Sequence, residues 1–154
     1  MLEATPLHWF SWDFSVKDQE QHIADIDISC WRDKGFVDIG NEKYRVYLER
    51  LLSGAFILQR DDKVLARAEK PGVFSSRFDI EHDGRKLTLR RRQLFSRSFL
   101  LADETGAVGT VSASSIFSRR MKIDLPETLP ISVRVFIIWL AVILWRRDSN
   151  AAAG

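Results

Sequence analysis

The chain has 154 residues, of which 45% are hydrophobic and 29% charged, and its formal net charge is +2. This balance is typical of a globular protein and excludes a disordered chain. The one cysteine, Cys30, excludes an internal disulfide, so nothing in the sequence requires an oxidising compartment. The N-terminus lacks the basic and apolar segments of a signal peptide, and we therefore expect a cytoplasmic protein.

The small net charge conceals an uneven distribution along the chain. Residues 1–59 contain six Lys and Arg against ten Asp and Glu, whereas residues 60–122 contain fourteen against eight. A basic half of this kind favours an anionic partner. A basic face that is only solvated explains the same pattern, and both interpretations stay open.

Short apolar segments containing an aromatic residue or leucine recur along the chain at a spacing of 21 or 22 residues. Their anchor positions are Phe10, Trp31, Leu52, Phe74, Phe95 and Phe117. The residues four positions after an anchor are Phe14, Phe56, Phe78, Phe99 and Met121. The residues two positions further on are Val16, Leu58, Ile80, Leu101 and Ile123. The second repeat departs by one residue, with Gly35 at the expected place and Phe36 after it. We interpret the pattern as six repeats.

Each repeat predicts a β-hairpin. An alternating strand such as Phe14–Val16 meets a turn, and a second alternating strand returns. The turns carry residues that tolerate a positive φ, and they are Gly40-Asn41, Asp61-Asp62, Asp83-Gly84 and Thr105-Gly106. The return strands are expected at residues 23–28, 44–48, 64–68, 87–89 and 108–111. Five hairpins of two strands each and a final strand at residues 121–125 give eleven strands, and a segment near Leu7 supplies a twelfth.

The segment Ile131–Trp145 predicts a helix that is apolar on every side from Val135 onward. Such a helix is buried either in protein or in lipid. A closed barrel of a dozen strands leaves a hole that needs a plug. Eleven helical residues span about 17 Å, and strands of five or six residues span about 17–20 Å. We therefore predict a mainly β fold, a closed antiparallel barrel of about 12 strands enclosing a helix at 131–146. The barrel domain is expected over residues 7–147, with flexible tails at 1–6 and 148–154.

A C-terminal membrane anchor is the competing interpretation of this helix. A spanning helix needs about 20 apolar residues, whereas a run of 10–14 is typical of a buried core helix. Extending the apolar run backwards meets Arg134 and then Pro130. Arg134 is costly near the middle of a bilayer but reaches water at the mouth of a barrel. We therefore favour the barrel plug.

The repeated aromatic hairpins from Trp9 to Asp124, followed directly by the apolar helix at 131–145, resemble the tubby C-terminal-like superfamily. The resemblance covers nearly the whole chain and is to the small LURP-one-related members, which are relatives of the phospholipid scramblases. It implies a twelve-strand barrel around a central helix. Because tubby proteins bind phosphoinositide head groups through basic residues on the barrel surface, it also implies a lipid-binding module. The chain lacks the cysteine-rich lipidation run and the acidic calcium loop of scramblases.

The sequence contains no recognisable catalytic constellation. His8, His22 and His82 are scattered and lack metal-ligand spacing, and no phosphate-binding or dinucleotide-binding glycine motif occurs. Asp25 and Asp27 lie on one face of a strand, and a solvated outer face explains them. We therefore expect a protein that is not an enzyme and that has no cofactor and no metal.

The candidate ligand-binding residues are basic and lie in the repeats that cover residues 85–122. They are Arg85, Lys86, Arg90, Arg91, Arg92, Arg97, Arg119, Arg120 and Lys122. If these repeats are neighbours, the set forms one basic face suited to phosphate groups. We predict a monomeric module that binds an anionic phospholipid head group, peripheral at the inner face of the membrane. A protein-interaction scaffold without lipid affinity is the alternative, and nucleic acid is not expected because no reading helix or basic aromatic platform occurs.

Overall fold

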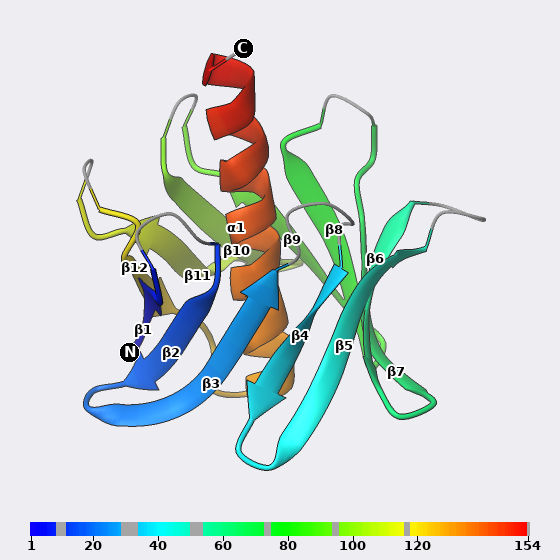
Figure 1. Cartoon of the computed structure of the whole chain (residues 1–154). Helices are drawn as coiled ribbons and strands as arrows, with labels where there is room; N and C mark the ends of the chain where they lie inside the picture. The colour runs from blue at the N-terminus through cyan, green and yellow to red at the C-terminus, as the bar shows by residue number, and fades with distance from the viewer. Residues whose placement is uncertain are drawn as a thin grey trace.

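The structure is a computed structural model that describes residues 1–8, 12–28, 34–49, 54–72, 75–93, 96–115 and 118–153, with side chains through residue 149. Over these residues the chain forms a closed barrel of twelve antiparallel strands around one helix (Figure 1). The predicted fold class is therefore confirmed. The six anchor positions of the repeat and Cys30 lie outside the described residues.

The strands follow one another around the barrel in the order of the sequence, and β1 closes the ring by pairing with β12. The elements are β1 (Leu2–Pro6), β2 (Phe14–Asp18), β3 (Gln21–Ile28), β4 (Lys34–Ile39), β5 (Glu42–Glu49), β6 (Ala55–Arg60), β7 (Lys63–Glu69), β8 (Arg77–His82), β9 (Arg85–Arg91), β10 (Ser98–Asp103), β11 (Gly106–Ala113), β12 (Met121–Asp124) and α1 (Ile131–Ala153).

Both predicted tails are corrected by these bounds. Residues 1–6 are not a flexible tail, because Leu2–Pro6 is the twelfth strand and its backbone pairs with both β2 and β12. At the other end α1 continues past residue 146 to Ala153, so most of the predicted tail at 148–154 is helical.

The repeat marks the positions that face the helix. Side chains alternate along a strand, so residues two apart share a face. Phe14 and Val16 on β2, and their counterparts on β6, β8, β10 and β12, are all at most 2% exposed. Asp25 and Asp27 on β3 alternate with the buried Ala24, Ile26 and Ile28, which places both carboxylates on the outer wall as expected.

The departure at Gly35 has a steric cause. Gly35 takes the inward position, and the following Phe36 points outward with 42% of its surface exposed. A Cβ built on Gly35 would lie 1.9 Å from the backbone oxygen of Asp27 on the neighbouring strand. Strands β3 and β4 therefore approach each other too closely for any side chain at this position.

The helix forms the core of the barrel. Val133 and every residue from Val135 to Trp145 are at most 5% exposed, because strands surround the helix on all sides. Helix α1 comes closest to β3, β4 and β8, and between β4 and β8 the ring of Phe56 on β6 meets the Trp139 indole. Among the described residues, no helix combines the length and the apolarity needed to cross a membrane.

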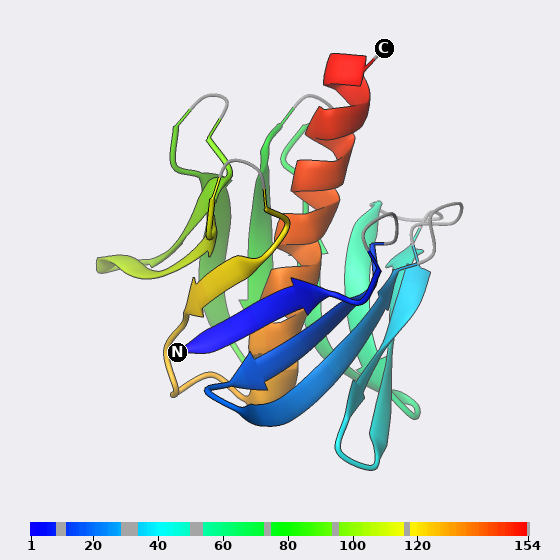
Figure 2. The same cartoon turned by 60° about the vertical axis from the view of Figure 1, so that its left-hand side comes forward.

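The helix is longer than the barrel that encloses it. Its 23 residues span about 35 Å at 1.5 Å each, whereas strands of four to eight residues span about 13–27 Å. The C-terminal turns therefore rise beyond the strands (Figure 2). We call this end of the barrel the exit end, and the opposite end, where α1 begins, the entry end.

Candidate anion-binding site at the exit end of the barrel

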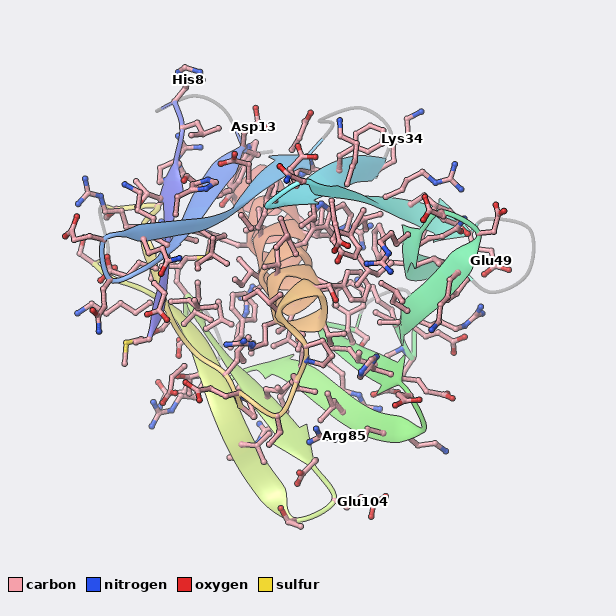
Figure 3. All side chains as sticks on the ribbon, turned by 90° about the horizontal axis from the view of Figure 1, so that it is seen from below. His8, Asp13, Lys34, Glu49, Arg85 and Glu104 are labelled. Atoms are coloured by element: carbon pink, nitrogen blue, oxygen red, sulfur yellow. The ribbon has the colours of Figure 1, made fainter. Side chains whose placement is uncertain are left out.

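The nine predicted basic residues do not form one cluster. Arg85 and Arg91 lie at opposite ends of β9, about 20 Å apart at 3.3 Å per residue. Arg85 and Lys86 lie at the entry end, where Arg85 Nη1 donates a hydrogen bond to Thr128 Oγ1 at 3.4 Å. Figure 3 views this end and shows Arg85 on the same side of the helix as Glu104. The expected single basic face is therefore divided.

Two further members of the predicted set lie on the outer wall. Arg90 is exposed and stands directly opposite Arg77 of β8. Lys122 is exposed on β12 and stands opposite Glu3 of β1. Both strand positions face away from the helix, so these two residues lie on the outer wall of the barrel.

The remaining five predicted residues gather at the exit end, where β9 ends and where β10 and β12 begin. They are Arg91, Arg92, Arg97, Arg119 and Arg120. Arg92 and Arg120 are exposed, and their backbone amides donate to Ser98 O at 2.8 Å and to Ser118 Oγ at 3.0 Å. The other three guanidinium groups pack against rings or the helix.

Two arginines and two tryptophans form a row across the exit end. The Arg97 guanidinium lies 5.2 Å from the centroid of Trp145, and the Trp145 and Trp12 rings meet edge-on at 5.9 Å. The Arg119 guanidinium lies 5.4 Å from Trp12, and its Nη2 donates to His8 O at 2.8 Å. Cation–π contacts of this kind are favourable and orient the guanidinium group. The row thus connects the segments before β2, β10 and β12 to the helix.

The helix and β7 add cations that the sequence reasoning did not select. Arg146 is only 7% exposed, and the Arg147 guanidinium lies 5.8 Å from the Phe56 centroid. Lys70 follows β7, and its pKa is lowered by burial and then by the charge of Arg147. We use the name basic crown for six cations at the exit end, which are Lys70, Arg91, Arg97, Arg119, Arg146 and Arg147. The exposed Arg92 and Arg120 are not included. Only the protruding length of the helix reveals that Arg146 and Arg147 belong to it.

Arg91 is the member of the basic crown that lies on β9, at an inward-facing position. It continues the inward series Leu87, Leu89 and pairs across the sheet with the buried Phe99, whose ring centroid lies 5.9 Å from the guanidinium. The side chain is 15% exposed and forms an ion pair with Asp148, which is 45% exposed. Burial lowers the pKa of both Arg91 and Arg119, because water no longer stabilises the charged form fully.

The opposite side of the wall is acidic. Because the strands follow the sequence around the barrel, the acidic first half of the chain becomes β1–β6 and the basic second half becomes β7–β12. At the exit end of β2 and β3, Asp13 Oδ1 accepts a hydrogen bond from the Ile28 amide at 3.1 Å. Burial, followed by the charge of Asp13, raises the pKa of Asp27. The uneven charge along the sequence thus gives the barrel one acidic side and one basic side.

A cavity of about 490 Å³ lies at the entry end beside Ile131 and Arg134. Its acidic lining is paired locally, with Asp18 Oδ1 3.5 Å from the N-terminal amine and His22 Nε2 2.9 Å from Asp25 Oδ1. Lys43 Nζ lies 3.8 Å from Asp38 Oδ1 in the same way. In the described part of the chain, no three His, Cys, Asp or Glu side chains come together to hold a metal ion. The basic crown is therefore the better candidate site.

No family model, no curated protein and no solved structure matches this chain. The chemistry of the basic crown is therefore the basis for a proposed function.

Proposed function

We propose that this protein is a non-enzymatic module that binds anionic phospholipid head groups through the basic crown. The observation that carries the proposal is the row of Arg97, Trp145, Trp12 and Arg119 across the exit end. Arg147 and Lys70 add two cations at the same end, near Phe56 and the end of β7. Arginine binds phosphate through two parallel N–H donors. Each basic residue near an anionic leaflet contributes about 1 kcal/mol.

The aromatic members of the row support a membrane surface as the partner. Tryptophan combines a large apolar ring with one polar N–H, a combination suited to the boundary between head groups and acyl chains. In this orientation the protruding end of α1 points toward the bilayer, and the hairpin turns of the entry end point away. The protein then acts as a monomer, peripheral at the inner face of the membrane.

The proposal includes kinship with the tubby-like superfamily, because that superfamily also encloses a C-terminal helix in a twelve-strand barrel. The ligand class implied by that kinship, phosphoinositide head groups, is the same as the class proposed for the basic crown. The proposed location differs, because the basic crown lies around the exit end and not on the outer wall that carries Arg90 and Lys122.

Co-sedimentation with vesicles tests this function. The vesicles contain phosphatidylcholine alone or phosphatidylcholine with a phosphoinositide, each at low and at high salt. We expect binding only to the phosphoinositide vesicles, and we expect salt to weaken it because the exposed charges are screened. Absence of binding at low salt contradicts the proposal. Salt-insensitive capture of a protein partner in that case favours the scaffold alternative.

A further inference from the structure

We propose that the Asp148 carboxylate occupies the position at which the oxyanion of the ligand binds, so that Arg91 is the principal ligand-binding residue and the end of α1 competes with the ligand. This inference rests on the proposed function, because it assigns the binding position within the basic crown. The ligand expected at this position is a phosphomonoester or inorganic phosphate, because a phosphate group presents several oxygens to one guanidinium group.

The placement of Arg91 is the first observation. By the alternation of β9, residue 91 belongs to the inward series that holds Leu87 and Leu89, where an apolar side chain would satisfy the core. A buried charge at such a position is costly unless a partner compensates it. An arginine that faces inward at the rim therefore indicates a position built to receive an anion.

The pairing with Asp148 is incomplete. Asp148 Oδ2 forms the ion pair with Nη2 of Arg91, but neither this oxygen nor the buried Nε of Arg91 has a hydrogen-bond partner among the described residues. A guanidinium fork is complete when two of its N–H groups each donate to an oxygen of the same anion. A phosphate group in place of the carboxylate supplies oxygens for both nitrogens, so the ligand satisfies a donor that Asp148 leaves unpaired.

Asp148 is also placed so that it is easily displaced. It is 45% exposed and lies five residues before the end of α1 at Ala153. Arg147 precedes it directly, and Lys70 lies within electrostatic range of Arg147. These charges attract a phosphate, which carries more negative charge than the carboxylate that it replaces.

The test compares Asp148→Asn with wild type and with Asp124→Asn. Asp124 is an exposed residue on β12 at the entry end, so this control removes the same charge far from the crown. Binding of inorganic phosphate is measured by isothermal titration, and binding to phosphoinositide vesicles by co-sedimentation. We expect Asp148→Asn to bind phosphate roughly tenfold more tightly, because the Asp148 carboxylate no longer competes with phosphate for Arg91. Asp124→Asn should match wild type.

Arg91→Gln supplies the second arm. In the double variant Arg91→Gln with Asp148→Asn, the gain in phosphate affinity seen for Asp148→Asn alone should be lost. Thermal unfolding of each variant checks that the barrel is intact. Phosphate affinity that is unchanged or weaker in Asp148→Asn overturns the inference, even if the vesicles bind and the proposed function stands. Tighter phosphate binding without any vesicle binding supports the inference, and in that case the membrane function fails. Phosphate binding by none of the proteins overturns the inference.

Discussion

The ring of Phe56 on the barrel wall meets the indole of Trp139 on the central helix edge-on, with centroids 4.9 Å apart and ring planes at 67°. Both side chains are at most 1% exposed, and Phe56 also meets Phe78 on β8 at 5.7 Å. The contact joins the repeat in the first part of the chain to the helix in the last part. The barrel wall and the helix therefore share one buried core.

Truncation of Phe56 tests this contact. We expect Phe56→Ala to lower the free energy of unfolding by about 3–5 kcal/mol, because it removes buried apolar surface and leaves a cavity beside Trp139. Denaturation in guanidinium chloride, followed by tryptophan fluorescence, measures the change. Phe36→Ala is the matched control, since Phe36 is 42% exposed on the outer wall, and it should cost about 1 kcal/mol or less. Equal costs for the two variants would show that Phe56 does not pack in the core.

A methyl group at residue 35 is expected to disrupt the pairing of β3 and β4. The added Cβ would lie 1.9 Å from the Asp27 backbone oxygen, and a backbone atom cannot move aside as a flexible side chain can. Gly35→Ala should therefore cost about 2 kcal/mol or more, or prevent folding. Gly72→Ala is the control, because nothing lies within 4 Å of its added Cβ. A Gly35→Ala protein as stable as Gly72→Ala would contradict the described approach of the two strands.

The stability of the protein should depend on pH through Asp27. Burial and the neighbouring Asp13 raise the pKa of Asp27, so the folded state binds this proton more tightly than the unfolded state. The contribution to stability is therefore present in acid and is lost as the pH rises through the folded pKa. At neutral pH, Asp27→Asn should raise the free energy of unfolding by about 0.5 kcal/mol, a small value because the group is exposed.

Unfolding midpoints of Asp27→Asn and wild type, compared across a pH series, measure this effect. The two curves should converge in acid and separate toward neutral pH, while the charge-matched Asp124→Asn should follow wild type. A variant that is less stable than wild type at neutral pH would show that the Asp27 carboxylate is stabilising instead.

Much of the fold was predictable because the repeat and the helix constrain each other. Phe14 and Val16 with their counterparts define inward positions, and a helix without a polar face requires a container, so the closed barrel follows. Tight turns were placed at Gly40-Asn41 and Asp83-Gly84, where Gly40, Asp83 and Gly84 have positive φ. The twelfth strand was expected near Leu7 but spans Leu2–Pro6. Its bounds were not predictable because so short a segment outside the repeat carries little alternation, and its place is fixed by pairing with β2 and β12.

The site was only partly predictable. Runs such as Arg90-Arg91-Arg92 are uniform in sequence, but alternation along β9 turns Arg91 inward and Arg90 outward, and the strand carries Arg85 to the far end of the barrel. The pairing of Arg91 with Asp148 depends on how far the helix extends beyond the strands. No local pattern encodes that length.

The most direct measurement compares two double variants that lose equal charge from opposite ends of the barrel. Arg97→Gln with Arg119→Gln removes two cations of the basic crown, and Arg85→Gln with Lys86→Gln removes two from the entry end. Affinity for phosphoinositide vesicles should fall about thirtyfold for the crown variant, since each lost cation costs about 1 kcal/mol. The entry-end variant should stay within about twofold of wild type. Equal losses in the two variants would contradict a site at the exit end.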